Sequence, residues 1–162
     1  MDVVTAIQAG ILYSPYYDQL IFAYRNKEGA IACIQARNFN PERAAKAKYF
    51  NSGRSSEVSP IFKAKDPVLD KHLVITEDAL SSLRIAALSD AMPALGTHVP
   101  VQKIIALKPF YEFVTVWLDS DKLREAREIA EKCKWLGLSA KTVYSELDPK
   151  CYTNEEILEF LK

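Results

Sequence analysis

The distribution of apolar residues divides the chain into an amino-terminal part with short strand-like runs and a carboxyl-terminal part in which strand and helix patterns alternate. In the first part, the runs QLIFAYR (19–25) and AIACIQAR (30–37) are joined by NKEG. This pattern predicts a β-hairpin whose loop uses Gly29 for a positive φ angle. Residues 38–72 are rich in turn formers and lack a period, which predicts a long irregular connection of a kind that is often functional.

In the second part, strand-like apolar runs alternate regularly with segments that have the periodicity of a helix. The expected elements are a strand at 72–76, a helix at 78–89, a short strand near 92–95, a helix at 100–107, a strand at 112–118, a helix from 121 to about 136, a strand at 140–145 and a last helix that opens with the capping-box spacing of Thr153 and Glu156. The run at 112–118 is almost continuously apolar, as in a strand covered on both faces. Such alternation predicts parallel βαβ units with helices on both faces of the sheet.

Composition narrows the class of protein. The chain has 162 residues, 49% hydrophobic and 26% charged, which suits one domain or one domain with a small satellite. Three cysteines without a C-x-x-C pair and two histidines predict neither a disulfide framework nor a zinc site. No apolar run is long enough to cross a bilayer, and Met1 is followed by an acid rather than by a signal sequence, so we expect a cytoplasmic protein without membrane contact.

The formal net charge is zero, but the charge is unevenly distributed. Residues 37–65 contain seven basic residues against two acidic ones, with four aromatic residues interleaved. Basic side chains follow phosphates and aromatic rings stack on bases, so this segment is a candidate groove for single-stranded nucleic acid or nucleotides. A solvated loop region with a few core aromatics explains the same composition, and composition alone leaves both interpretations open.

Acidic residues follow two of the predicted strands. Glu77 comes directly after the strand at 72–76, and the sequence WLDSD places Asp119 and Asp121 after the strand at 112–118. Parallel sheets bind ligands at the carboxyl ends of their strands, and Mg²⁺ prefers oxygen ligands. If these strands are neighbours, three carboxylates converge and need a cation to offset their repulsion. The alternative is that these acids only cap helices or stabilise their first turns.

A glutamate after one strand and D-x-D after a later one resemble the signature of Toprim domains. MPALGTH (92–98) and LDPKCYTNEEI (147–157) are similar to a turn and a tail in the Toprim regions of DnaG-type and phage primases. Ahead of them, AGI (9–11), the hairpin ending at Arg37, KYFNS (48–52) and IFK (61–63) resemble the small basic subdomain that precedes Toprim in these primases. The resemblance implies an α/β fold with a basic mixed α/β subdomain over 1–68 and a Toprim domain with a parallel sheet flanked by helices over 69–162.

For the site, the resemblance implies that Glu77, Asp119 and Asp121 are catalytic and hold Mg²⁺ or Mn²⁺. It also implies a groove for template, growing RNA or incoming nucleotide, lined by Arg37, Lys48, Tyr49, Asn51 and Lys63. The expected function is a DNA primase core that makes short RNA primers on single-stranded DNA from ribonucleoside triphosphates by metal-dependent nucleotidyl transfer. A helicase or zinc-ribbon protein would be a separate partner, and a phage-encoded chain would act in the host cytoplasm.

Two alternatives use the same residues differently. A Toprim nuclease would employ the three acids with water as the nucleophile, and the KYFNS motif speaks against it. A module that only binds single-stranded DNA or a replisome protein is favoured by departures from the pattern, since Asp78 and Ser81 stand where the family has a glycine and an aspartate. Asp78 is either a further metal ligand or an acid at a helix start.

Overall fold

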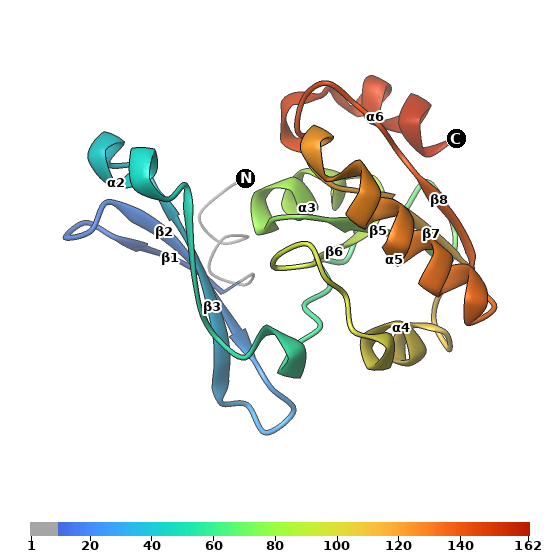
Figure 1. Ribbon diagram of the computed structural model, residues 1–162, viewed down its shortest axis with the longest axis horizontal. Helices are drawn as coiled ribbons and strands as arrows, with labels where there is room; N and C mark the ends of the chain where they lie inside the picture. Colours follow the sequence, from blue (N-terminus) through green and yellow to red (C-terminus); the bar gives the residue numbers. More distant parts are fainter. Residues whose placement is uncertain (1–9) are drawn as a thin grey trace. The chain divides into compact units, whose positions relative to one another are not determined.

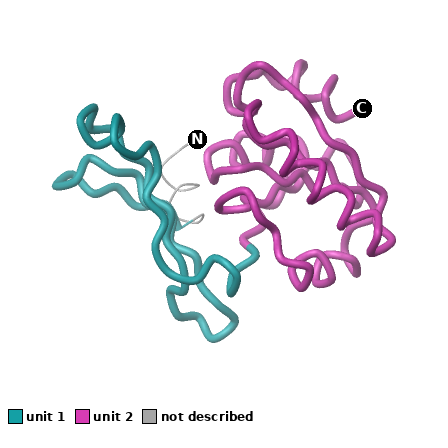
Figure 2. Tube along the Cα trace, in the orientation of Figure 1, with its two compact units in different colours: residues 1–59 teal, residues 60–162 magenta. Residues whose placement is uncertain are grey.

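The computed structural model describes residues 10–162. The chain divides into two compact units, the first ending at Ser59 and the second beginning at Pro60 (Figure 2). In the second unit, Phe62 forms an isolated bridge with Ala91. A domain boundary after residue 68 stays a prediction. No helix among residues 10–162 is both long and apolar enough to cross a membrane.

Over residues 10–59, the first unit is an antiparallel sheet in the order β1-β2-β3-β4 with one short α-helix (Figure 1). Its elements are β1 (Ile11–Ser14), β2 (Gln19–Arg25), β3 (Ile31–Asn38), α2 (Pro41–Lys46), β4 (Tyr49–Gly53) and a 3-10 turn, η1 (Ser55–Glu57). Strands β2 and β3 form the predicted hairpin. The prediction of an irregular segment over 38–72 was wrong in part, because α2 and β4 lie within it.

Local chemistry explains both elements. The Asn40 side chain accepts hydrogen bonds from the amides of Glu42 and Arg43, and Pro41 occupies the first turn, so α2 has a strong start signal. Strand β4 pairs with β3, placing Tyr49 opposite Arg37. It is an edge strand with four of its five residues exposed, so it has none of the alternation that identifies a half-buried strand.

The second unit is a parallel sheet in the order β6-β5-β7-β8, which confirms the predicted α/β class. Its elements are β5 (His72–Thr76), α3 (Ala79–Ile85), β6 (Asp90–Pro93), α4 (Val101–Leu107), β7 (Phe113–Trp117), η2 (Ser120–Lys122), α5 (Leu123–Trp135), β8 (Ser139–Thr142), η3 (Pro149–Cys151) and α6 (Asn154–Leu161). The capping box of Thr153 and Glu156 is present at the start of α6.

Helices cover both faces of this sheet, and alternate side chains of each strand point to opposite faces. Leu73 and Ile75 of β5 pack with buried residues of α4 and α5. Val74, between them in sequence, packs with Trp117 of β7 and with residues of α3 and α6 on the other face. The two central strands, β5 and β7, are therefore covered on both sides and hold their carboxyl ends in a fixed position.

Candidate active site

The carboxyl edge of the parallel sheet brings two predicted acids together. Strands β5 and β7 are hydrogen-bonded neighbours, with Thr76 opposite Trp117 at their ends. Glu77 follows Thr76 directly, and Asp119 lies two residues beyond Trp117. The two strands are therefore adjacent, as the convergence of the acids requires.

Glu77 is a half-buried carboxylate with one oxygen left unsatisfied. It accepts a hydrogen bond from the backbone amide of Asp119, whereas its Oε2 atom is buried and has no hydrogen-bond partner among the described residues. Burial raises the pKa of Glu77 to about 7, and the negative charges of Asp119 and Asp121 add to the rise. A buried oxygen of this kind is costly unless a cation or proton occupies its lone pair.

The third predicted acid, Asp121, is paired with a lysine. Its side chain is 70% exposed and forms an ion pair with Lys122 at 2.6 Å. This hydrogen bond lowers the pKa of Asp121. Within residues 10–162, no three side chains of Asp, Glu, His or Cys are already gathered as a metal-ligand set. A cation that used all three predicted acids would therefore draw Asp121 away from Lys122.

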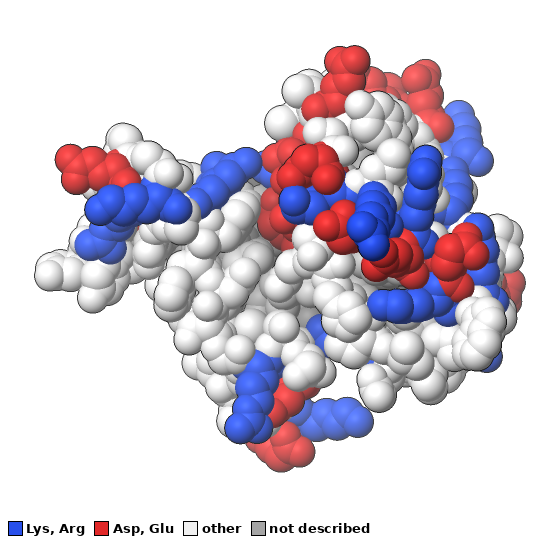
Figure 3. Space-filling view, viewed as in Figure 1, with Lys and Arg blue, Asp and Glu red and all other residues white. Residues whose placement is uncertain are grey.

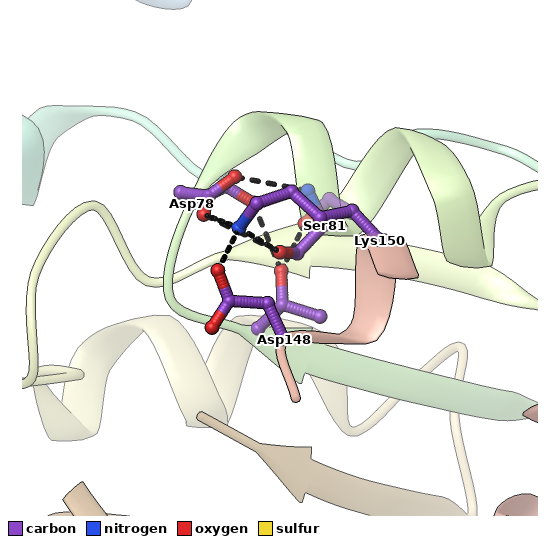
Figure 4. A network of polar contacts seen from close by, with 6 residues as sticks. Asp78, Ser81, Asp148 and Lys150 are labelled. Carbon is purple, nitrogen blue, oxygen red and sulfur yellow. Dashed lines mark hydrogen bonds and ion pairs between the residues drawn. The ribbon is translucent and has the colours of Figure 1, made fainter. Parts of the chain in front are cut away.

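A second polar cluster lies beside Glu77, at the start of α3 (Figure 4). The Asp78 side chain caps α3 by accepting a hydrogen bond from the Ser81 amide at 2.9 Å, which confirms its interpretation as a helix-start acid. Lys150 of η3 donates to Asp78 Oδ2 at 3.0 Å and to Asp148. Burial lowers the pKa of Lys150, but its two carboxylate partners outweigh burial and the pKa is raised overall, so the ammonium stays charged.

The predicted nucleic-acid residues of the first unit gather at one end of its sheet. Arg37 and Tyr49 are cross-strand partners, and the guanidinium carbon lies 4.9 Å from the centre of the tyrosine ring. The Nε and Nη1 atoms of Arg37 are buried without a hydrogen-bond partner in the described chain. Asn51 accepts a hydrogen bond from Gln35 at 3.1 Å, and Lys48 is exposed. Figure 3 shows further basic side chains over the neighbouring helix α2.

Lys63 belongs to a different part of the molecule from the acids. It donates hydrogen bonds to Asp90 at 2.7 Å and to the Tyr111 hydroxyl at 2.9 Å. Asp90 is the first residue of β6, so Lys63 lies beside the amino end of that strand. Glu77 and Asp119 follow the carboxyl ends of their strands, and the structure does not bring Lys63 to that edge.

No protein-family model and no curated protein sequence matches the chain. Solved structures do match it. The zinc-binding and RNA polymerase domains of Aquifex aeolicus primase match with a TM-score of 0.69 and 16% identity, over 99% of this chain and 46% of that one. The primase fragment of the bacteriophage T7 primase-helicase protein matches with a TM-score of 0.62 and 17% identity, over 98% and 70%. The fold is that of a primase catalytic core.

The RNA polymerase domain of Mycobacterium tuberculosis primase DnaG, solved in complex with double-stranded DNA, has a TM-score of 0.57 and 18% identity. It is matched over 93% of this chain and 56% of its own, so this chain spans about half the length of these two bacterial primase chains. At these identities the likeness establishes the fold, and activity has to be argued from the site.

Two lysines at the site were not predicted. Lys122 is adjacent in sequence to Asp121, so the ion pair could have been anticipated from their proximity. Lys150 belongs to the LDPKCYTNEEI motif (147–157), but its partner Asp78 is 72 residues away in the sequence. No sequence signal connected Lys150 to Asp78, because the two residues lie far apart in the sequence and meet only in the folded chain.

Proposed function

We propose that this chain is a metal-dependent primase-like core that synthesises short RNA primers on single-stranded DNA by nucleotidyl transfer. The observation that carries the proposal is the half-buried Glu77 beside Asp119, with an unsatisfied Oε2 atom, at the carboxyl edge of a primase-like sheet. Ligands of parallel α/β sheets bind at this edge. The Aquifex and T7 matches support the reaction class by analogy of fold.

The donor set fits a hard divalent cation. Glu77 and Asp119, joined by Asp121 once it leaves Lys122, would offer only oxygen ligands, as Mg²⁺ and Mn²⁺ prefer. When bound, such an ion supplies charge neutralisation for the reacting phosphates. Glu77 and Asp119 would hold that cation, and Lys122 would gain the freedom to contact a phosphate when Asp121 turns to the metal.

The first unit would hold the nucleic acid. Phosphoryl transfer requires positioning and electrostatic stabilisation more than covalent participation by the protein. Arg37 is half-buried, and its guanidinium is the kind of group that binds phosphate oxygens, while Tyr49 offers a ring for stacking. On the first unit, the groove that we propose for template, growing RNA or nucleotide uses Arg37, Lys48, Tyr49 and Asn51. Lys63, which the resemblance also implies, belongs to the second unit and is hydrogen-bonded there to Asp90 and Tyr111. A helicase or zinc-ribbon partner would be supplied separately.

The test incubates the protein with single-stranded DNA, labelled ribonucleotides and Mg²⁺ or Mn²⁺. We expect short RNA products that fall by at least about a hundredfold in Asp119→Ala/Asp121→Ala. Glu112→Gln is the matched control, because Glu112 is an exposed acid just before the amino end of the same strand β7.

Other results would assign another function. Metal-dependent loss of the DNA itself, without RNA synthesis, would identify a nuclease that uses the same acids. Binding of single-stranded DNA that survives chelation, with no product under any condition, would identify a binding module. Synthesis that persists in the double variant would refute the assignment of the two aspartates.

A further inference from the structure

The ammonium group of Lys150 sits among three oxygen atoms (Figure 4). It donates to Asp78 Oδ2 at 3.0 Å, to Ser81 Oγ at 3.4 Å and to Asp148 Oδ2. The Lys150 side chain is 20% exposed, and the side chains of Asp78 and Asp148 are 4% and 23% exposed. An ammonium has three donors, so this set of oxygens satisfies it completely.

If the Lys150, Asp78 and Asp148 cluster had only a structural role, its burial would be energetically unfavourable. Removing an ammonium and two carboxylates from water costs several kilocalories per mole, and well-packed apolar residues often serve stability better. The cluster also lies beside the candidate metal ligands. Asp78 follows Glu77 in sequence, and Asp148 is close enough to Asp121 for its charge to act on it. The lysine thus neutralises carboxylates at the same edge that would bind the divalent ion.

The lysine also anchors the turn that carries Glu77. Asp78 uses one carboxylate oxygen to cap α3 and the other to accept from Lys150. Its carbonyl accepts a hydrogen bond from the Thr76 hydroxyl at 3.0 Å. The residues on both sides of Glu77, Thr76 and Asp78, are therefore held in place. Asp78 is held by the start of α3 and by Lys150 of η3.

We propose that Lys150 is a positioning residue that acts as a built-in cation. Its ammonium neutralises the carboxylates of Asp78 and Asp148, so that a single divalent ion binds at the neighbouring carboxylates of Glu77 and Asp119. The inference rests on the proposed function only in requiring that a divalent ion binds at the carboxyl edge. It does not require that the protein synthesises RNA.

The experiment counts bound Mn²⁺ in the full chain, using electron paramagnetic resonance of free Mn²⁺, and measures the thermal midpoint with and without Mn²⁺. Lys150→Met removes the charge and keeps most of the length, and Lys150→Arg keeps the charge. Lys134→Met is the matched control, because Lys134 forms an exposed ion pair with Glu131 on α5.

We expect one bound ion in the unaltered protein, in Lys150→Arg and in Lys134→Met. Lys150→Met should bind two ions, because the vacated oxygen set then accepts a second cation, and Mn²⁺ should raise its thermal midpoint by more than it raises that of the unaltered protein. A lysine with a structural role alone would lower the midpoint equally with and without Mn²⁺ and leave the ion count unchanged.

One ion and an equal midpoint rise in Lys150→Met would overturn the proposal, as would two ions in the unaltered protein. No ion in the unaltered protein would instead refute the metal site itself, and with it the proposed function. If Lys150→Met does not fold without metal, refolding is compared in Mn²⁺ and in NaCl of equal ionic strength. Recovery in Mn²⁺ alone supports the built-in cation, and failure in both salts refutes it.

Discussion

His72 makes the stability of the second unit depend on pH. It begins β5, is only 6% exposed, and its Nε2 atom lies 2.8 Å from the Thr115 hydroxyl of β7. Burial lowers the pKa of His72 to about 4, and the positive charge of Lys141 acts in the same direction. We predict that the free energy of unfolding decreases as the pH falls from about 6.5 towards 4.

The sign follows from proton binding in the two states. An unfolded histidine titrates near pH 6.5, so between the two pKa values the unfolded chain binds more protons than the folded one. The contribution is complete above pH 6.5 and is lost progressively below it. A shift of this size has an upper limit of about 3 kcal/mol. The ring borders a surface groove that Lys141 also lines, where water screens the charge, and we therefore expect about 1 to 2 kcal/mol.

The assay compares urea unfolding at pH 7.5 and pH 4.5 for the unaltered protein, His72→Gln and His98→Gln. Carboxylates that titrate in all three proteins cancel in the comparison. His72→Gln will be less stable than the unaltered protein at pH 7.5, and we expect that difference to shrink by about 1 to 2 kcal/mol at pH 4.5. His98, the second of two histidines, is exposed and serves as the control. An equal His72→Gln difference at both pH values would refute the reasoning.

Three further outcomes are expected. Arg37→Ala should lower the salt dependence of single-stranded DNA binding by about one unit of slope, whereas the exposed Arg25→Ala should not; equal slopes would remove Arg37 from the groove. In denaturant titrations, Gly29→Ala should cost about 1 kcal/mol because its φ is +81°, and Gly53→Ala clearly more, because its Cβ would also lie 2.2 Å from a β3 carbonyl oxygen. A thiol reagent should label one cysteine in the native protein, the exposed Cys151, and all three after unfolding; faster labelling of a second thiol would contradict the burial of the other two.

The sequence predicted the elements whose pattern is set by burial. Strands β5 and β7 are covered on both faces, so they appear as continuous apolar runs, and α5 shows a clear apolar stripe formed by Ala126, Ile129, Ala130 and Cys133. Strand β4 was not predicted, because it is largely exposed. It lies at a sheet edge with most of its side chains in solvent, so its pairing with β3 leaves no trace in the order of apolar residues.

The candidate site was predictable to the extent that it depends on strand ends. Glu77 and Asp119 stand where apolar runs stop, and the parallel topology alone brings such positions to one edge. The partners of each carboxylate could not be predicted, because they depend on where loops return. Asp121 turns to Lys122 and Asp78 is paired with Lys150, and both choices decide which oxygens stay available for a cation.

Whether the carboxylates at this edge serve as the metal ligands that we propose, or only as helix-start acids, therefore depends on how their charges are balanced more than on the identity of the acids. At this edge, Asp78 and Asp148 are paired with the ammonium of Lys150, and the exposed Asp121 is paired with Lys122 in an ion pair that solvent and salt screen. Glu77 has no such partner for its buried Oε2 atom. An unsatisfied buried oxygen is destabilising, and it is relieved either by a proton, which the raised pKa of Glu77 favours, or by the divalent cation that we propose; a bound cation would hold Glu77 ionised at a pH where the metal-free carboxyl is partly protonated.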